Sequence, residues 1–299
     1  MSRLKRWLSL AGETMHMAWR HDCLGQAKAA AYSTILFFFP LLLFVVALLL
    51  ATNILTPVLQ AIAGIFPPFL PKDTQALLWD YIESTSHRDP IHLLVGSFLI
   101  LLWTGWGLMS TFIEGVNRAY GLHEDRSALK DQVAAIKLLV FASLPLLALG
   151  AFAIVGTRLE VWLSDSIGHS LLIFWTVLDW VAVLLSMVSV NCIVYYFGAH
   201  RRQTFREVIP GAVLATAIWV LATAAFHGYV THVARYDLIY GSLGAAIILF
   251  GWMYLGSLAV MLGAEFNAVV EHASKRQPHE TAPARPRSRR IVRGAGDGR

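Results

Sequence analysis

Residues 29–52 read AAAYSTILFFFPLLLFVVALLLAT and carry no charged side chain. A helix needs about 20 consecutive apolar residues to cross the hydrocarbon core of a bilayer. This stretch is long enough to span a membrane and too long for the apolar region of a cleaved signal peptide. Five further apolar runs follow it, and the six predicted spans are 29–52, 93–113, 136–157, 171–197, 209–230 and 242–264.

The composition agrees with a membrane protein. Hydrophobic residues make up 57% of the 299-residue chain and charged residues only 14%, whereas soluble domains carry about 25% charged residues. So few charges do not suffice to cover a water-facing surface. The sequence therefore predicts an all-α, polytopic membrane protein with six transmembrane helices.

The basic residues lie on alternate sides of these spans. Of the 24 Lys and Arg residues, all but four fall before the first span, in the second–third and fourth–fifth connections, and after the sixth span. Such a bias marks the cytoplasmic side of a membrane protein, so both termini are predicted to be cytoplasmic. This distribution also accounts for the net charge of +5 without a nucleic acid partner.

Three segments flank or interrupt the predicted transmembrane domain, which covers 29–272. Residues 1–28 form a basic amphipathic segment, interpreted either as a helix on the inner leaflet or as a plain topological anchor. The connection 53–92 is a long outer loop in which 73–83 is predicted to form a short amphipathic helix. The tail 273–299 is rich in Pro, Arg and Gly and is predicted to be a disordered cytoplasmic segment.

Polar residues inside the predicted spans are the candidate functional residues, because ionisable groups are costly in hydrocarbon. Asp179 lies well inside the fourth span, in its outer half. It is either a contact for substrate or protons, or a structural carboxyl that pairs with a neighbouring helix or snorkels outward. A hypothetical substrate path combines Asp179 with seven residues near the inner helix ends: Tyr32, Glu114, Asn117, Arg118, Asn191, Glu265 and Asn267. The alternative is that these ends are polar simply because they meet water.

Other residues indicate helix packing. Pro40 and Pro145 are expected to kink their helices and free backbone carbonyls. Small residues allow helix backbones to approach closely in lipid, and the last span contains or adjoins Gly241, Gly244, Gly251, Gly256 and Gly263. The two cysteines, Cys23 and Cys192, are too few for a disulfide framework or a zinc motif. No metal and no cofactor is predicted.

Three groups of residues resemble markers of the YihY/BrkB family of bacterial inner-membrane proteins. The first is Ala29-Ala30-Ala31-Tyr32-Ser33-Thr34 followed by Phe39-Pro40-Leu41, and the second is Asn117-Arg118-Ala119-Tyr120-Gly121. The third extends from Tyr240-Gly241-Ser242-Leu243-Gly244-Ala245 through Trp252-Met253-Tyr254-Leu255 to Leu262-Gly263-Ala264-Glu265-Phe266-Asn267. Together they are specific, and the resemblance covers about residues 15–272. It implies a six-helix protein of the inner membrane without an assigned reaction, and a role in envelope lipid transport.

Three functions follow as hypotheses. The first is transport of a lipid or another amphiphile, with membrane lipids as the partners. The second is a scaffold that binds an envelope protein through the outer loop. The third is the ribonuclease activity once attributed to the family, which is disfavoured because no extramembrane segment carries a recognisable set of metal ligands. The chain is therefore expected not to be an enzyme, and small-residue helix faces permit a homo-oligomer.

Overall fold

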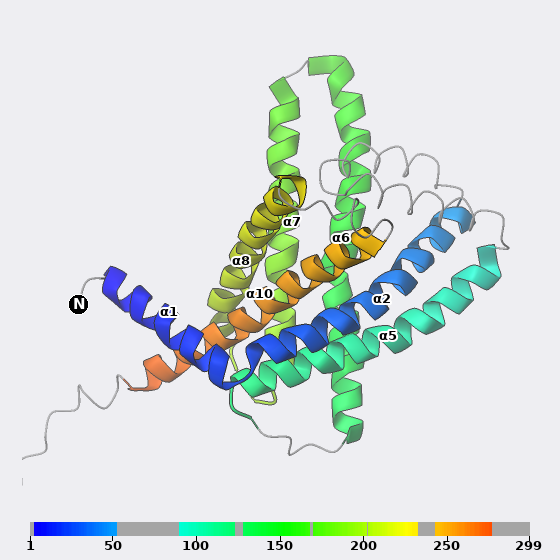
Figure 1. Cartoon of the computed structure of the whole chain (residues 1–299). Helices are drawn as coiled ribbons and strands as arrows, with labels where there is room; N and C mark the ends of the chain where they lie inside the picture. Colours follow the sequence, from blue (N-terminus) through cyan, green and yellow to red (C-terminus); the bar gives the residue numbers. More distant parts are fainter. Residues whose placement is uncertain are drawn as a thin grey trace, which may run out of the picture.

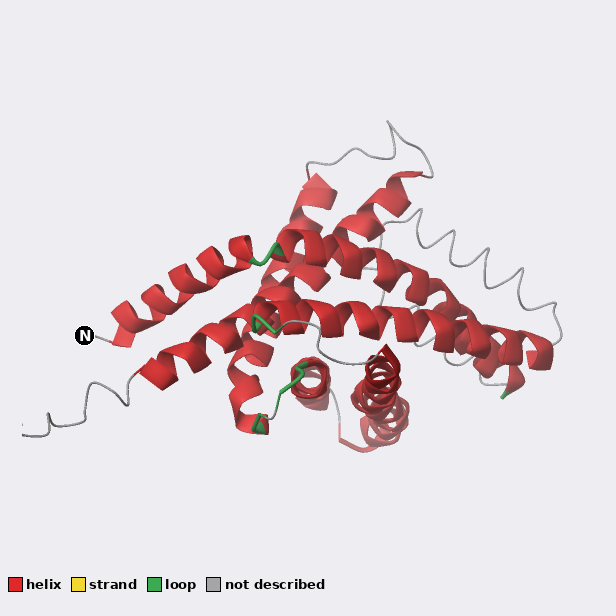
Figure 2. Cartoon of the chain, turned by 90° about the horizontal axis from the view of Figure 1, so that it is seen from below, coloured by secondary structure: helices red, strands yellow, loops and turns green. Residues whose placement is uncertain are grey.

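The computed structural model describes residues 3–52, 90–122, 128–167, 170–201, 203–232 and 243–276. Seven helices make up this part of the chain (Figures 1 and 2). They are α1 (Arg3–Arg20), α2 (Cys23–Ala51), α5 (Pro90–Ala119), α6 (Ala128–Ile167), α7 (Ser170–Gly198), α8 (Phe205–His232) and α10 (Leu243–Arg276). The predicted all-α fold class is confirmed.

Six of these helices, all except α1, are long and apolar enough to cross a membrane. Each predicted span lies within or almost within one of them, but the helices extend further. The span predicted at 136–157 belongs to a helix of 40 residues, which at 1.5 Å per residue is about 60 Å long. The apolar pattern detects only the part of a helix that meets hydrocarbon, whereas the backbone hydrogen bonds continue into the polar region.

The boundary between α1 and α2 depends on Asp22. This residue adopts the left-handed conformation, with φ of 53°, and its side chain accepts a hydrogen bond from the backbone N–H of Gly25. Asp22 is therefore the N-cap of α2. The first membrane helix begins at Cys23, six residues before the predicted start, and the amphipathic part of the predicted segment 1–28 is the separate helix α1.

The six long helices alternate in direction, so that α2, α6 and α8 begin at the same end of the bundle at which α5, α7 and α10 finish. We call this end, which also carries α1, the α1 end. Fully buried side chains from five helices form the core here: Val116, Leu138, Tyr195, Val208 and Ala264. The distribution of basic residues predicts that the α1 end faces the cytoplasm, and this orientation stays a prediction.

The helices form two groups that diverge away from the α1 end. Helix α2 packs along α5 and α10, whereas α6 packs along α7. Helix α8 joins the groups, because it packs on both α10 and α7. In Figure 1, α6 and α7 stand upright while α2 and α5 run obliquely across the molecule.

Several predictions fall outside the described residues. They concern most of the outer loop 53–92, including the helix predicted at 73–83, and Gly241. The tail is predicted to be disordered from residue 273, but α10 continues through Arg276, so that boundary is wrong by four residues. The residues beyond Arg276 are not described.

Candidate functional site

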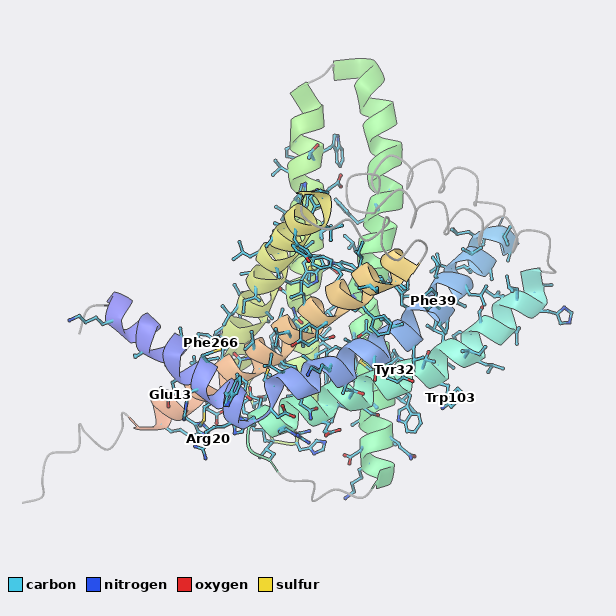
Figure 3. The ribbon with its side chains drawn as sticks, viewed as in Figure 1. Glu13, Arg20, Tyr32, Phe39, Trp103 and Phe266 are labelled. Atoms are coloured by element: carbon cyan, nitrogen blue, oxygen red, sulfur yellow. The ribbon has the colours of Figure 1, made fainter. Side chains whose placement is uncertain are left out.

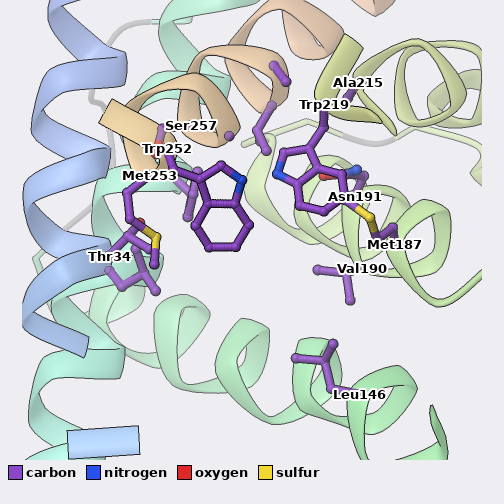
Figure 4. Close-up of a pocket in the computed structure, with 15 residues that line it drawn as sticks. Thr34, Leu146, Met187, Val190, Asn191, Ala215, Trp219, Trp252, Met253 and Ser257 are labelled. Atoms are coloured by element: carbon purple, nitrogen blue, oxygen red, sulfur yellow. The ribbon is translucent and has the colours of Figure 1, made fainter. Parts of the chain in front are cut away.

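A pocket of about 260 Å³ lies where the two groups of helices diverge. All six long helices contribute side chains to it: Thr34 from α2, Leu108 and Phe112 from α5, Leu146 from α6, Met187, Val190 and Asn191 from α7, Ala215 and Trp219 from α8, and Trp252, Met253, Gly256, Ser257, Ala259 and Val260 from α10. The lining is predominantly apolar. The pocket is partly open, and Leu146, which is 53% exposed, stands across from the two tryptophans in Figure 4.

Two tryptophans form one wall of the pocket. The ring centroids of Trp219 and Trp252 lie 5.9 Å apart, with the planes inclined by 55°. The Nε1–H of Trp252 donates to the hydroxyl of Thr223 at 3.3 Å, which fixes the orientation of that ring. Tryptophan is enriched at membrane interfaces, but these two lie well inside their helices. Their position within the spans is the sequence signal that could have identified the pocket.

Asn191 is a residue of the predicted substrate path that reaches the pocket. Its Nδ2 donates to the hydroxyl of Thr216 at 3.3 Å, and that hydroxyl donates to the carbonyl of Ala212. Both side chains are buried. Of the eight residues predicted as a substrate path, Asn191 alone lines the pocket. Together with the hydroxyls of Thr34 and Ser257 it supplies a few polar groups in an otherwise apolar space.

Glu265 lies at the α1 end and contacts the loop between α1 and α2. The Nδ1 atom of His21 is 2.9 Å and 3.2 Å from the two carboxyl oxygens of Glu265. The Glu265 side chain is only 3% exposed and that of His21 is 26% exposed. Burial, and secondarily the Arg20 guanidinium, lower the pKa of His21 below its usual value, which disfavours the charged form of the imidazole.

Asn117 connects the end of α5 to the end of α7. Its Nδ2 donates to the carbonyl oxygens of Ile113 and Gly198, and its Oδ1 accepts the backbone N–H of His200 at 2.7 Å. The last carbonyls and the following N–H groups of a helix lack intrahelical partners. Asn117 satisfies such groups at the α7 terminus, which favours a structural role over a place in a substrate path.

Asn267 makes an equivalent connection between α10 and α8. Its Oδ1 accepts the N–H of Gly211 at 2.7 Å, and its Nδ2 donates to the carbonyl of Val208 at 3.0 Å. The side chain is buried, and both of its polar atoms are occupied by backbone groups. The role predicted for Asn267 in a substrate path stays untested, but these hydrogen bonds indicate that it holds two helices together.

Arg201, in the α7–α8 connection, is a residue that the sequence analysis did not single out. Its guanidinium pairs with Glu271 of α10 and lies 4.5 Å from the ring centroid of Tyr120. It also lies 3.7 Å from Glu207 of α8. Burial raises the pKa of Tyr120 to about 12, although Arg201 acts in the opposite direction. Arg201 therefore links three helix ends around a neutral phenol.

The remaining path residues do not line the pocket. Glu114 and Arg118 form the expected i, i+4 ion pair at 3.0 Å, and both are largely exposed. Tyr32 of α2, labelled in Figure 3, is 59% exposed, and Asp179 is exposed on α7. The eight predicted residues thus do not form one polar ring. Asn191 lines the pocket, Asn117 and Asn267 bind backbone groups of neighbouring helices, and Glu265 is buried. The other four residues are exposed.

The predicted packing residues lie inside continuous helices. Pro40 is within α2 and Pro145 within α6, where the hydroxyl of Ser186 on α7 donates to the Pro145 carbonyl at 3.1 Å. Gly244 is buried near the start of α10. A Cβ on Gly251 would lie 3.2 Å from Phe226, and one on Gly256 would lie 3.3 Å from Trp219. Gly263 packs more tightly still, against α8.

The described side chains include no group of three or more His, Cys, Asp or Glu residues suited to a metal ion. An apolar pocket with a few polar groups, open between membrane helices, can accept a hydrocarbon chain and orient one polar group beside it. The buried carboxyl–imidazole pair at the α1 end can bind and release protons.

Comparison with known proteins places the sequence of this chain in a family. The family model described as "Virulence factor BrkB" matches residues 14–289. The "Putative ribonuclease-like protein YfkH" of Bacillus subtilis is 29% identical over 86% of this chain and 93% of its own length. No solved structure matches.

Two further relatives are described as UPF0761 membrane proteins. The protein VV0203 of Vibrio vulnificus is 26% identical, over 87% of this chain and 82% of its own length. The relative from Pelodictyon phaeoclathratiforme is 28% identical over 80% of this chain, but the match spans only 55% of that longer protein.

Proposed function

We propose that this chain, which belongs to the BrkB virulence-factor family of multi-pass membrane proteins, moves a lipid or another amphiphile in the bacterial inner membrane. The observation that carries this proposal is the partly open apolar pocket between the two groups of membrane helices. Its sides are provided by helices that are long and apolar enough to cross a membrane, which gives an acyl chain a route into the pocket from the bilayer.

The size of the pocket suggests which part of a lipid it takes. Pockets for whole small molecules measure about 300–1,000 Å³, and this one measures about 260 Å³. It is too small for an entire phospholipid. It suits one hydrocarbon chain or a segment of one, with the polar group of the amphiphile near Asn191 and Ser257.

The polar groups of the α1 end complete the proposal. We expect a headgroup to approach this end, where Glu265 lies buried and where Glu114 and Arg118 are exposed. Asn117 and Asn267 hold the helix ends in place. The chain then acts as a transporter and not as an enzyme, and its partners are membrane lipids. A second copy of the chain and an envelope protein are further proposed partners, and nucleic acid is not one.

The test is a leaflet-exchange assay. The purified full chain is placed in liposomes that contain a phospholipid with a fluorescent headgroup, and a membrane-impermeant quencher reports movement between the leaflets. Protein-dependent exchange above that of protein-free liposomes and of an unrelated six-helix protein is the expected result. If no exchange occurs with phospholipids or with single-chain amphiphiles, the transport proposal is wrong and a scaffold function takes its place.

A further inference from the structure

Glu265 presents an unusual electrostatic situation. It lies in α10, within an apolar stretch long enough to cross a membrane, and its side chain is 3% exposed. A buried carboxylate is costly unless a partner compensates its charge. Within the described part of the chain, the ion-pair partner of Glu265 is His21, and burial disfavours the charged form of that imidazole.

Other charged groups on the surrounding helices do not replace that partner. Arg20 of α1 is exposed, and the nearest titratable groups at the start of α2 are Asp22 and Cys23, which add negative potential when ionised. Among the remaining charged groups on helices packed against α10, Glu114 pairs with Arg118 on α5, and Glu207 and Glu271 pair with Arg201, where Glu271 also contacts Lys275. Lys5 of α1, Lys28 of α2 and Arg206 of α8 are exposed.

The proton balance follows from these contacts. When α1 is released and both groups meet water near pH 7.5, the carboxyl is ionised and the imidazole is mostly neutral, because their usual pKa values are about 4.3 and 6.5. The released pair then carries one negative charge. When the pair is buried again, that uncompensated charge is unfavourable, and one proton from solvent neutralises it by binding to a carboxyl oxygen or to the imidazole.

We propose that His21 and Glu265 form a proton-binding site that takes up one proton when α1 and the start of α2 close onto α10. An apolar contact lies in the same helix pair, since Leu10 of α1 packs against Phe266 and Val269 of α10. The apolar contact holds the helices together, and the proton site makes its strength depend on pH.

The site lies on helices that also form the pocket. Helix α10 carries Glu265 and, about one and a half to three and a half turns away, the lining residues Val260, Gly256 and Trp252, whereas α2 begins beside His21 and carries Thr34. Closure of the α1 end therefore acts on two walls of the pocket. The inference that protons drive or gate lipid movement rests on the proposed function, whereas the proton site itself does not.

The first experiment measures closure directly. Spin labels are attached to the exposed positions Ala11→Cys on α1 and His272→Cys on α10 of the full chain in liposomes, and the distance distribution is recorded from about pH 8.5 to about pH 6.5. Uptake of one proton predicts that the ratio of closed to released molecules rises by up to about tenfold per pH unit as the pH falls. A ratio that does not change over this range overturns the proposal.

Substitutions of Glu265 and His21 test whether the proton binds to this pair. Glu265→Gln is expected to abolish the rise, whereas His21→Gln, which keeps a hydrogen-bond donor beside the carboxyl, retains it. Asp131→Asn is the matched control, because it changes a second acid that lies 3.2 Å from an imidazole, that of His200, and it should leave the rise unchanged. The assignment of the proton to His21 and Glu265 is overturned by either of two results. One is loss of the pH-dependent rise in closure in Asp131→Asn, and the other is persistence of that rise in a monodisperse Glu265→Gln protein.

The leaflet-exchange assay at the same pH values separates the two proposals. A pH-dependent exchange rate that becomes insensitive in Glu265→Gln supports proton coupling. Exchange that is equally fast at every pH overturns the coupling and leaves the lipid function standing. A label distance that titrates without any lipid exchange overturns the lipid function and leaves the proton site standing.

Discussion

A Cβ atom on Gly263 of α10 would lie 2.6 Å from the carbonyl oxygen of Gly211 on α8. It would also lie 2.8 Å from the Cβ of Ala215, and it would overlap the hydroxyl oxygen of Tyr195. The backbones of α8 and α10 are therefore in direct contact at this point. Close backbone contact between small residues is a common means of joining helices in lipid, where the hydrophobic effect between them is weak.

Gly263→Ala is expected to destabilise the protein by about 1–3 kcal/mol, because one methyl group must be inserted into a closely packed helix crossing. Gly150→Ala on α6 is the matched control, since a Cβ there meets no atom within 4 Å. The control should be neutral or slightly stabilising. Thermal unfolding in detergent measures both, and equal stability of the two variants would contradict the close crossing.

Asn267→Leu is expected to remove the two hydrogen bonds that join α10 to α8, with the Gly211 N–H and the Val208 carbonyl. Each hydrogen bond contributes about 0.5–1.5 kcal/mol, so stability falls by about 1–3 kcal/mol even though the new side chain is apolar. His272→Leu, at an exposed position of the same helix, should have little effect. If Asn267→Leu is as stable as the wild type but loses lipid exchange, Asn267 belongs to the substrate path and not to the helix contact.

Arg201→Gln should destabilise the α1 end by about 1–3 kcal/mol, because Glu271 is mostly buried and loses a charged partner. The contact of Arg201 with the Tyr120 ring is lost as well. Arg118→Gln removes an equally charged side chain from an exposed pair, which is worth about 0–1 kcal/mol. Chemical denaturation of the two variants checks the difference, and the reverse order would refute the linking role of Arg201.

Val190→Trp is expected to fill the pocket and to slow lipid exchange at least tenfold with little loss of stability, because Val190 lines the pocket but is only partly buried. Leu185→Trp places the same ring on an exposed position of the same helix. That variant should exchange lipid at the wild-type rate. Equal rates in the two variants would show that the pocket is not on the route.

The Glu265→Gln variant should show a pH dependence of closure with the opposite sign to the wild type. Burial lowers the pKa of His21 in the closed form, whereas the released imidazole titrates at about pH 6.5. In the variant, closure is therefore strongest above about pH 6.5 and weakens as the pH falls, because only the released form binds the proton.

In the wild type the released His21 and the closed pair each hold one proton below about pH 6.5, so the dependence levels off there. The label distance between α1 and α10, recorded from about pH 6.5 to about pH 5, distinguishes the two curves. Stronger closure of Glu265→Gln in acid would mean that another group takes up the proton.

The amino-acid sequence was sufficient to predict the membrane helices. Runs such as 29–52 identify the spans because hydrocarbon tolerates only long apolar helices, a constraint that acts along the chain and does not depend on neighbours. The pairing of Glu114 with Arg118 was predictable for a related reason, since residues four apart always share one face of a helix. Helix ends were less accurate, because they depend on local caps such as Asp22.

Three asparagines that have similar positions in the predicted spans make different contacts in the structure. Asn117, Asn191 and Asn267 all lie in the half of their helices nearer the α1 end, yet one lines the pocket and the other two bind backbone groups of neighbouring helices. Which atoms an amide meets depends on the rotation and crossing of helices far apart in the sequence. No periodicity within a single helix contains that information.

The sequence by itself therefore determined the class of the protein, the number of membrane helices and the family, because these depend on hydrophobicity and on short groups of residues along the chain. Only the tertiary structure decided that Trp219 and Trp252 border one pocket and that His21 meets Glu265, 244 residues away. Such contacts form where two helix groups diverge or where a terminal helix folds back. They depend on packing in three dimensions, which the local pattern of apolar and polar residues does not specify.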